Sequence, residues 1–470
     1  MRQKAVSELL RAAPVALELG RRFDAAGFAL ALVGGSVRDA MLGRLGTDLD
    51  FTTDARPDDV LVLVRGWADA VWDVGIAFGT VGARKGGWDL EITTYRAEAY
   101  DRDSRKPDVA YGSSLEDDLQ RRDFRVNAMA VALPALAFVD PFEGMTDLAA
   151  GVLRTPGRPE DSFDDDPLRM LRAARFASQL GFRVAPEVAR AMAAMAERLS
   201  IVSAERVQTE LTKLVLGQQP RAGLEVLVRT GLAAYVLPEL PALALEIDEH
   251  HRHKDVYEHT LTVLEQAIAL EPTLPEGGPD LVLRLAALLH DIGKPKTRAF
   301  EDDGKVSFHF HEVVGARMAR ARLKALRYDK STVEDVSRLV ELHLRFHGYA
   351  EGAWTDSAVR RYVRDAGPLL ERLHALTRSD CTTRNRTKAA RLQRAYDSLV
   401  TRIEQLRAQE EIDAIRPDLD GTEIMAVLGI PPGPVVGKAY KYLLELRLDR
   451  GPVAKDEAEA ELRRWYAEQA

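Results

Sequence analysis

The spacing of apolar and polar positions changes along the chain and separates stretches of different secondary structure. Residues 1–26 carry apolar side chains at helical spacing and predict an amphipathic helix interrupted at Pro14. From Phe28 to Phe142, short apolar runs alternate with glycine, aspartate and proline, which is typical of β-strands. The expected strands are FALALVGG, DLDFTT, VGIAFGTVGA, WDLEITTY and AVALPALAFVDPF, and the expected helices between them are SVRDAMLG and PDDVLVLVRGWADAV. The first 155 residues therefore predict a mixed unit of strands and helices.

Beyond Pro159 the pattern becomes helical almost throughout. Apolar residues recur at helical spacing in DPLRMLRAARFASQL, PEVARAMAAMAERL, SAERVQTELTKLVLG and PRAGLEVLVRTGL. Nine of the ten histidines lie between 250 and 347, and the last eighty residues are helical again, with PPGPVVG as a turn before the final helix. We expect an α+β protein with four parts, at 1–155, 156–245, 246–385 and 386–470.

Composition narrows the class of protein. The chain has 470 residues, of which 46% are hydrophobic and 29% charged, which excludes a disordered, collagen-like or disulfide-stapled chain. Its single cysteine, Cys381, cannot form an internal disulfide, so we expect a reducing, cytoplasmic location. The sequence predicts neither a secretory signal nor a membrane span. The net charge of −8 argues against a nucleic-acid partner, although a total does not show whether basic residues cluster.

A glycine turn and two aspartates form the first candidate site. Gly34 and Gly35 follow an apolar strand and precede a helix, an arrangement in which backbone N–H groups approach an anion. Asp48 and Asp50 alternate with Leu49 and Phe51, so their carboxylates share one face of a strand. Two carboxylates so close repel each other unless a cation lies between them, and oxygen ligands suit Mg²⁺. Glu91, in the strand WDLEIT, could supply a third carboxylate. Either motif alone is more often a plain turn or a solvated strand end.

Three long motifs in order carry a specific resemblance. The motif GGSVRDAMLG followed by DLDF, then LEDDLQRRDFRVNAMAV, then EGMTDLAAGVLRTPGRPEDSFDDDPLRMLRAARFASQLGF resembles the tRNA branch of the nucleotidyltransferase superfamily. This branch comprises the bacterial CCA-adding enzymes and the bacterial poly(A) polymerases, and the match covers about residues 28–240. The resemblance implies in-line nucleotidyl transfer with pyrophosphate leaving and metal ions held by Asp48 and Asp50. It also implies nucleotide contacts from Gly35, Arg38, Arg122 and Asp123, whereas Glu91 is not used uniformly in the family.

The helix expected from DDDPLRMLRAARF carries charged residues at intervals of three. Asp166, Arg169, Arg172 and Arg175 would form a polar ridge beside an apolar face. Such ridges are usually solvated, but this one could face a cleft. By the resemblance, Asp166 and Arg169 hydrogen-bond the edge of the incoming base and select C and then A, with Arg172 and Arg175 in support.

Histidines and aspartates on successive helices form the second candidate site. His290 and Asp291 close the apolar helix LVLRLAALLHDIGK, and a lone histidine there is more often a core residue than a ligand. Together with the other histidines and Asp380, they resemble the HD superfamily of metal-dependent phosphohydrolases. The resemblance implies a four-ligand core of His259, His290, Asp291 and Asp380, with His311 and His343 as the extra ligands of two-metal members. Mn²⁺, Ni²⁺, Fe²⁺ and Mg²⁺ all suit such ligands. His250, His251 and His253 have no matching role and are expected on the surface.

Two basic clusters change the interpretation of the net charge. The first comprises Arg317, Arg320, Arg322, Lys324, Arg327 and Lys330, and the second comprises Arg378, Arg384, Arg386, Lys388, Arg391 and Arg394. Each alone is usually a solvated helix face, but together they form a plausible track for the tRNA backbone. The leading hypothesis is Mg²⁺-dependent addition of C, C and A to the tRNA 3′ end from CTP and ATP. The alternatives are poly(A) polymerase, CC-only or A-only addition, a phosphohydrolase acting at the HD site, and an RNA-binding scaffold. The sequence leaves the oligomeric state open.

Overall fold

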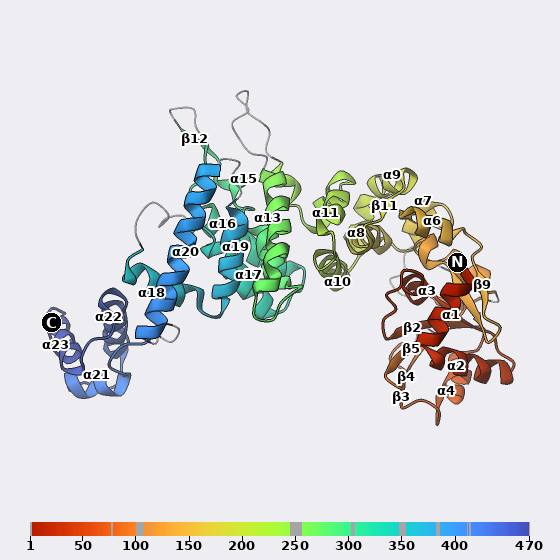
Figure 1. Cartoon of the computed structure of the whole chain (residues 1–470), viewed down its shortest axis with the longest axis horizontal. Helices are drawn as coiled ribbons and strands as arrows, with labels where there is room; N and C mark the ends of the chain where they lie inside the picture. The colour runs from red at the N-terminus through yellow and green to blue at the C-terminus, as the bar shows by residue number, and fades with distance from the viewer. Residues whose placement is uncertain are drawn as a thin grey trace. The chain divides into compact units, whose positions relative to one another are not determined.

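The computed structural model describes residues 2–76, 79–99, 108–112, 114–244, 256–301, 306–346, 354–381, 386–410, 412 and 415–469. The predictions for His250, His251, His253 and Arg384 lie outside these residues. The chain forms two compact units, Met1–Val236 and Leu237–Ala470, and each is described by itself (Figure 1). No helix among the described residues combines the length and apolar character that a membrane span requires.

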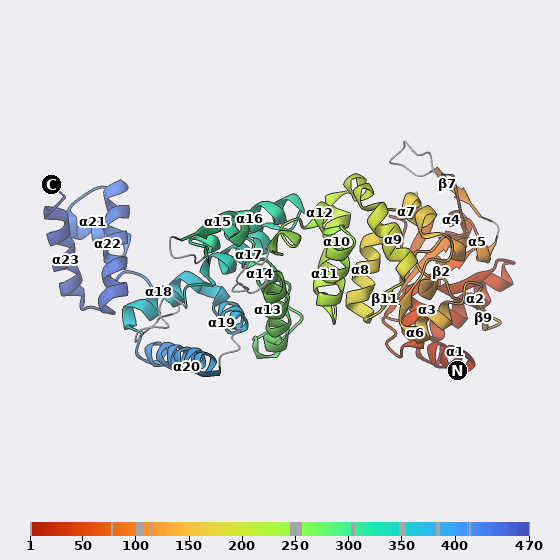
Figure 2. The same ribbon diagram turned by 90° about the horizontal axis from the view of Figure 1, so that it is seen from above.

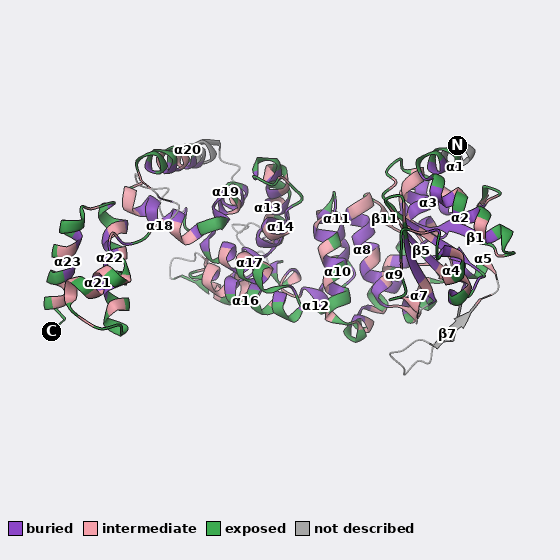
Figure 3. Ribbon diagram, turned by 90° about the horizontal axis from the view of Figure 1, so that it is seen from below, coloured by how far each residue is buried: buried purple, intermediate pink, exposed green. Residues whose placement is uncertain are grey.

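A seven-stranded mixed sheet forms the centre of the first unit. Its strand order is β3-β4-β5-β2-β1-β8-β9, in which β2 and β5 are parallel and every other neighbouring pair is antiparallel. The predicted alternation is present, because β1 is buried along its whole length and Leu49, Phe51, Leu90 and Ile92 enter the core (Figure 3). The strands are β1 (Leu30–Val33), β2 (Asp48–Thr53), β3 (Ala70–Trp72), β4 (Thr80–Lys85), β5 (Trp88–Thr94), β8 (Ala130–Leu133) and β9 (Ala137–Val139).

Helices surround this sheet, and the first unit departs from the predicted elements in two places. The N-terminal helix is broken at Pro14 as expected. The helix predicted over PDDVLVLVRGWADAV is wrong in its second half, because it ends at Val64, Arg65 is extended and β3 follows. A β6–β7 hairpin was also not predicted. The helices are α1 (Arg2–Ala12), α2 (Pro14–Ala25), α3 (Gly34–Met41), α4 (Pro57–Val64), α5 (Leu115–Gln120) and α6 (Gly144–Ala150), and the hairpin strands are β6 (Arg96–Ala99) and β7 (Asp108–Tyr111).

A helical segment completes the first unit. Helix α8 packs against both α10 and α11, and its apolar face is buried (Figure 2). Two short strands, β10 (Val152–Leu153) and β11 (Arg183–Val184), pair in parallel beside it. The helices are α7 (Pro159–Asp165), α8 (Leu168–Leu180), α9 (Pro186–Ala194), α10 (Ala204–Val215), α11 (Pro220–Arg229) and α12 (Ala233–Val236).

Where the structure describes it, the second unit is helical except for one hairpin of two short strands. Helix α14 packs against α13, α17 and α19, and α16 packs against α17, so that the helices carrying the predicted histidines are neighbours (Figure 1). The hairpin joins β12 (Ala299–Phe300) to β13 (Val306–Ser307). The helices are α13 (Val256–Leu270), α14 (Leu281–Leu289), α15 (Lys294–Thr297), α16 (His311–Ala325), α17 (Lys330–Leu342), α18 (Asp356–Ala366), α19 (Leu370–Asp380) and α20 (Arg386–Gln409).

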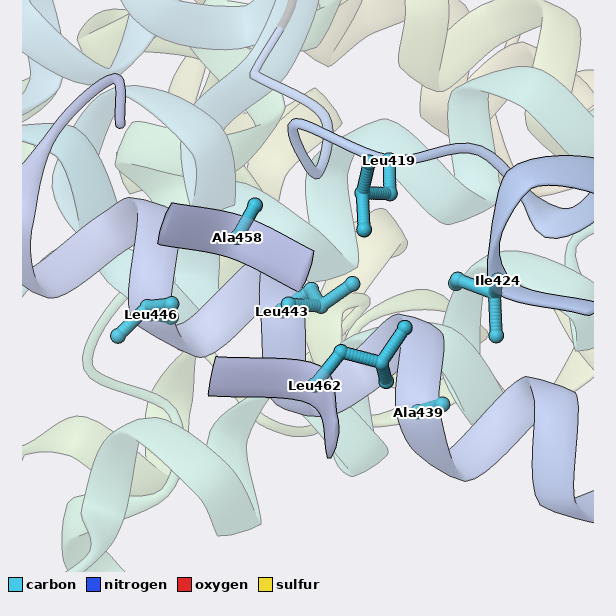
Figure 4. Close-up of a cluster of buried hydrophobic side chains, with 7 residues drawn as sticks. All are labelled: Leu419, Ile424, Ala439, Leu443, Leu446, Ala458 and Leu462. Atoms are coloured by element: carbon cyan, nitrogen blue, oxygen red, sulfur yellow. The ribbon is translucent and has the colours of Figure 1, made fainter. Parts of the chain in front are cut away.

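The tail has its own apolar core. Helices α21 (Gly421–Leu428), α22 (Pro434–Arg450) and α23 (Lys455–Ala467) enclose Leu419, Ile424, Ala439, Leu443, Leu446, Ala458 and Leu462 (Figure 4). Two helices, rather than one final helix, follow the PPGPVVG turn, because Gly451 ends α22 in a conformation with φ +85°. The α+β class is confirmed: a mixed sheet is followed by helices almost throughout.

Candidate functional site

The first candidate site lies where β2 and β5 run side by side. These strands pair in parallel with Asp50 opposite Glu91, so Asp48, Asp50 and Glu91 project from the same face while their neighbours enter the core. Asp50 is half-buried, whereas Asp48 and Glu91 are exposed. Among the described residues, these three carboxylates do not all converge within 4.8 Å of one another. The strands thus place them on one face without enclosing a three-ligand cage.

The glycine turn brings the start of α3 against this face. Gly34 has φ +68°, and a Cβ built on it would lie 2.8 Å from Nη1 of Arg122. A Cβ on Gly35 would lie 3.9 Å from Oδ2 of Asp50. Ser36 fixes the approach, because its Oγ accepts a hydrogen bond from the Asp50 N–H (3.0 Å) and donates one to the Asp48 carbonyl (3.3 Å). Because these glycines lack side chains, the turn backbone faces the Asp50 carboxylate and the Arg122 guanidinium with no side chain between them.

The carboxylates of this face repel one another. Burial and the charge of Asp48 raise the pKa of Asp50, against the opposing effect of Arg122 and Arg38. Burial, Asp50 and Asp48 likewise raise the pKa of Glu91. A cation beside them would relieve this repulsion, and carboxylate oxygens are the donors that Mg²⁺ takes. The residues present therefore fit a hard divalent cation.

Two arginines flank the carboxylates. Arg38 is buried, donates to Asn127 Oδ1 through Nη1 (2.6 Å) and to Asp39 through Nε and Nη2 (3.0 and 2.8 Å). Arg122 donates to Asp118 Oδ2 (3.2 Å). Arg38 and Asp39 also line an open recess of about 250 Å³ with Arg44, Gln179, Leu180, Leu216, Gly217 and Gln218. Fixed cations beside an opening are suited to an anionic ligand.

Asp123 is buried and bonded on several sides. It accepts hydrogen bonds from Arg172 Nε (2.8 Å), Asn127 Nδ2 (2.8 Å) and the Phe124 N–H (2.8 Å). Burial alone would raise its pKa, but Arg172 and Asn127 outweigh burial and hold the pKa of Asp123 below its usual range. Its ionised carboxylate thus holds Arg172 of α8 against the sheet-containing part of the first unit.

The prediction that Asp166 shares a helical ridge with the three arginines is wrong. Asp166 lies between α7 and α8 with an extended backbone, because Pro167 disfavours the helical conformation in the residue before it. It accepts from the Leu168 N–H and pairs with Arg206 (2.8 Å). Arg169 donates to the Ser162 carbonyl and Oγ and to the Arg121 carbonyl. Both side chains are held by neighbours and not by each other.

Two residues that the sequence analysis did not select complete this network. Glu210 on α10 is buried and accepts from Arg175 Nη1 (3.1 Å), with Arg172 Nη1 at 3.8 Å. The Phe176 ring lies under the guanidinium carbons of Arg38, Arg172 and Arg175, at 5.0, 5.6 and 4.2 Å. Burial and Arg172 lower the pKa of Arg175 to about 10. The sequence signal that could have identified Glu210 is an acidic residue among the apolar positions of the helical segment SAERVQTEL.

The second candidate site gathers all six predicted ligands. His259 comes from α13, His290 and Asp291 from the end of α14, His311 from the start of α16, His343 from the end of α17 and Asp380 from the end of α19. They form two groups, one of His259, His290 and Asp380 and one of Asp291, His311 and His343, each with ligand atoms within 4.8 Å of one another. Asp291 also reaches the first group, with Oδ2 3.3 Å from His290 Nε2 and 3.6 Å from His259 Nε2. His309 is exposed and does not join them.

The histidine rings are oriented for ligation. Nδ1 of His290, His311 and His343 bonds the carbonyl three residues earlier, at 2.8, 2.8 and 2.6 Å. A carbonyl accepts, so each ring is protonated at Nδ1 and directs Nε2 inward, as second-shell bonds do in metal sites. These three Nε2 atoms are buried, and those of His290 and His311 lie 3.3 and 3.2 Å from the Asp291 carboxylate oxygens. Buried imidazole and carboxylate ligands of this kind fit a divalent transition metal.

Neighbouring groups of this cluster shift the pKa values of two of its histidines in opposite directions. Burial opposes a charge on His290, but Asp291 and Asp380 outweigh it and raise its pKa to about 10. Burial and the charge of His290 lower the pKa of His343 to about 3. Because a metal ligand must be unprotonated, a metal ion held by His290 would displace its proton.

The fold and the first site together define a metal-dependent nucleotidyltransferase followed by an HD domain. Three family models match the chain, described as the Poly A polymerase head domain over residues 30–154, the probable RNA and SrmB-binding site of polymerase A over 181–243 and the HD domain over 256–385. The chain belongs to the family of bacterial tRNA nucleotidyltransferases and poly(A) polymerases.

Two relatives align over most of the chain, and a third over 45% of it. The A-adding tRNA nucleotidyltransferase of Deinococcus radiodurans is 34% identical over 446 residues, covering 93% of this chain and 96% of its own. The CC-adding tRNA nucleotidyltransferase of Thermus thermophilus is 33% identical and covers 92% and 93%. The CCA-adding enzyme of Levilactobacillus brevis is 43% identical over 213 residues, which are 45% of this chain and 52% of its own.

Solved structures share the fold. The Bacillus stearothermophilus CCA-adding enzyme in complex with CTP aligns over 97% of both chains with a TM-score of 0.68 and 25% identity. The Thermotoga maritima CCA-adding enzyme complexed with tRNA aligns over 99% of this chain and 98% of its own, with a TM-score of 0.62 and 18% identity.

Proposed function

We propose that this protein adds C, C and A to the 3′ end of tRNA, using CTP and ATP and releasing pyrophosphate. The observation that carries the proposal is the approach of Asp50 to the glycine turn and to Arg122, with Asp48 on the same face of β2. Relatives over the full chain length are named tRNA nucleotidyltransferases, which supports tRNA as the acceptor. The single cysteine supports action in the cytoplasm.

Different residues of the head domain would bind the metal ions and the triphosphate during nucleotidyl transfer. Asp48 and Asp50 would hold Mg²⁺, with Glu91 as a further candidate. When bound, such ions stabilise the attacking 3′-oxygen and the leaving pyrophosphate oxygen together. Arg38 and Arg122 present fixed positive charge toward the turn, where the triphosphate of the incoming nucleotide would lie against Gly35. Because Arg38 is already bonded to Asn127 and Asp39, and Arg122 Nη2 to Asp118, these side chains are held in place before substrate binds.

Base selection is assigned to the junction of α7 and α8. Asp166 offers an acceptor and Arg169 offers donors, and each is held by its own partners. Arg172 and Arg175 support them through Asp123 and Glu210, which tie α8 to the head and to α10. A rigid donor and acceptor pair can hydrogen-bond the edge of a base without a nucleic-acid template.

The test is incorporation of labelled nucleotide into tRNA that ends before CCA. Asp50→Asn and Asp48→Asn should each lower incorporation from CTP and ATP by at least about 100-fold, because they remove charge that stabilises the transition state. Asp58→Asn is the matched control, since Asp58 is an exposed aspartate on α4 away from the site. Incorporation by Asp50→Asn at the rate of the Asp58→Asn control would rule the assignment out.

A partial activity is the second candidate, because the two relatives named above that align over nearly the whole chain are the A-adding and the CC-adding enzymes. Offering CTP alone, ATP alone and both to tRNA ending before CCA, and to tRNA ending in CC, separates these activities. Full CCA on the first acceptor supports the proposal. Addition of CC only, or of A only to the second acceptor, identifies a partial enzyme, and long A tails on unrelated RNA identify a poly(A) polymerase.

We also propose that the HD domain holds two divalent transition-metal ions and hydrolyses phosphoesters. The ligand sets are His259, His290 and Asp380 on one side and Asp291, His311 and His343 on the other. Bound metal would polarise the phosphoryl group and activate water, while the chain's own Nδ1–H bonds fix the ring orientations. His290→Ala/Asp291→Ala should abolish phosphate-ester hydrolysis, and equal hydrolysis by this variant and the wild type would eliminate the site.

A further inference from the structure

One buried aromatic ring in the first unit lies among three positive charges. Phe176 is on α8, is 3% exposed, and packs edge-on against Phe124 with the ring centroids 5.9 Å apart. The guanidinium carbons nearest to its centroid lie at 4.2, 5.0 and 5.6 Å and belong to Arg175, Arg38 and Arg172. A cation within about 6 Å of an aromatic centroid is attracted by the negative face of the ring. The Phe176 ring therefore attracts three guanidinium groups at once.

These guanidinium groups belong to two different parts of the proposed nucleotide site. Arg38 comes from α3, close to the metal-binding face. Its Nη2 would lie 3.6 Å from a Cβ on Gly35, and Asp50 Oδ2 would lie 3.9 Å from the same point. Arg172 and Arg175 come from α8, the helix at whose start base selection is assigned. The ring is thus a side chain that the proposed triphosphate site and the base-selecting helix both contact.

Three like charges so close together repel one another. Burial and the neighbouring charges of Arg172 and Arg38 lower the pKa of Arg175 to about 10. Acidic side chains offset part of this repulsion, with Asp39 beside Arg38, Asp123 beside Arg172 and Glu210 beside Arg175. These acids come from three different parts of the chain, whereas the ring is a neighbour of all three arginines. Its attraction therefore acts on the whole group of cations.

The ring also connects two elements that are distant in sequence. Phe176 belongs to α8 and Arg38 to α3, and the attraction between them crosses from the helical segment to the sheet-containing part of the first unit. Arg172 and Arg175 lie one turn and one residue before Phe176 on its own helix, and their guanidinium groups hold the ring from that side. A displacement of α8 consequently moves the ring and, with it, Arg38.

We propose that Phe176 is a positioning residue for nucleotidyl transfer, and that its ring couples recognition of the base to placement of the triphosphate. A base that fits leaves α8 in place, so the ring holds Arg38 beside the triphosphate. A base that does not fit displaces α8, and Arg38 moves away from the position in which it aligns the triphosphate. This inference rests on the proposed nucleotidyl transfer and assigns a role in it to a residue that touches no substrate.

The test changes the charge distribution of the ring and keeps its size nearly constant. Monofluorinated, difluorinated and trifluorinated phenylalanine are introduced in place of Phe176 in the full-length chain. Each added fluorine withdraws electrons and weakens the negative face of the ring. Initial rates of addition to tRNA that ends before CCA then give kcat/KM for CTP and for UTP, whose base differs from cytosine at its hydrogen-bonding edge.

The expected result is a graded loss that depends on the base. We expect kcat/KM for CTP to fall with each fluorine, by about 10-fold for the trifluorinated ring, which is the size of a buried cation–π contribution. The value for UTP should change little, because a base that does not fit gains nothing from the coupling. The preference for CTP over UTP therefore falls in step with fluorination, whereas a purely structural defect would lower both values equally.

Controls separate the electrostatic effect from damage to the core. The matched control is trifluorinated phenylalanine in place of Phe23, a fully buried ring on α2 with no cation over it in the described part of the chain, and it should leave the preference unchanged. Phe176→Leu, which is apolar but has no negative ring face, should reproduce the loss of preference, and circular dichroism verifies that each variant is folded.

Two outcomes overturn the proposal, and they are distinguishable. A constant preference for CTP over UTP across the fluorinated series, with an active wild-type protein, shows that Phe176 only fills space and overturns this inference alone. A wild-type protein that adds no nucleotide to the acceptor overturns the proposed function and this inference together.

Discussion

Replacing Asp123 by asparagine tests the claim that the head and α8 are joined by a buried ion pair. The Asp123 carboxylate is 7% exposed and accepts three hydrogen bonds, one of them from Arg172 Nε at 2.8 Å, and Arg172 Nη2 forms an ion pair with it at 2.6 Å. Asparagine keeps the shape but turns an N–H toward Arg172 and removes its shortest ion pair, leaving Glu210 at 3.8 Å. Removing one partner of a buried pair costs about 3–5 kcal/mol, and we expect the lower end because the Arg172 side chain is 32% exposed.

The assay for Asp123→Asn is native-state hydrogen exchange of α8 amides, which reports the free energy of opening that region without assuming that the two units unfold together. We expect a loss of about 3 kcal/mol. The matched control is Asp164→Asn, which breaks the exposed pair between Asp164 and Arg198 (3.0 Å) and should cost at most about 1 kcal/mol. Equal protection in the two variants would refute the reasoning.

The pH dependence of this difference has a definite sign. Arg172 and Asn127 hold the pKa of Asp123 below its usual range in the folded protein, against the effect of burial. The carboxylate therefore stabilises the fold fully above its unfolded pKa of about 3.9, and this stabilisation is lost as pH falls through the lower folded pKa. The difference between wild type and Asp123→Asn should be constant from about pH 5 to 8 and shrink below about pH 4.

Three further predictions address the other parts of the molecule. Gly34→Ala should raise KM for CTP, because a Cβ there would displace Arg122. The control is Gly43→Ala, which has a similar backbone cost of about 1–2 kcal/mol at φ +72° but no atom within 4 Å of the new Cβ, and it should leave KM unchanged. Equal changes of KM in the two variants would contradict this prediction. In an Asp48→Asn/Asp50→Asn background, His343→Ala should bind about one metal ion fewer than the background protein, measured by elemental analysis. His309→Ala in the same background is the control and should keep the full metal content. An undiminished metal content in His343→Ala would refute the ligand set. Arg320→Gln/Lys324→Gln should reduce the slope of the logarithm of the tRNA association constant against the logarithm of the salt concentration by about 2 compared with wild type. Arg463→Gln in the tail is the control and should leave this slope unchanged. An affinity that does not depend on salt would show that the first basic cluster is only a solvated face.

The sequence predicted best where one local pattern decides the structure. The strands β1, β2 and β5 were predicted because short apolar runs are bounded by glycine or aspartate, and alternation alone placed Asp48 and Asp50 on one face. The six HD ligands were identified from motif resemblance, although up to 121 residues separate them, and the structure brings all of them together.

The sequence failed where two local signals compete or where partners are distant. Spacing of three predicted Asp166 on the α8 ridge, but Pro167 restricts the residue before it and left Asp166 extended. The run VLVLVRGW predicted a longer helix, but the chain leaves the helix at Arg65 and forms β3. Glu210 was not found because its partner Arg175 is 35 residues away on another helix.

The most direct test of the central claim is sequencing the 3′ ends of tRNA after incubation with the purified protein. The acceptor ends before CCA, and CTP and ATP are offered separately and together with Mg²⁺. We predict that both nucleotides together yield ends completed to CCA, and that Asp50→Asn yields unextended ends. Ends that stop at CC with both nucleotides present, or unextended ends with the wild-type protein, would contradict CCA addition.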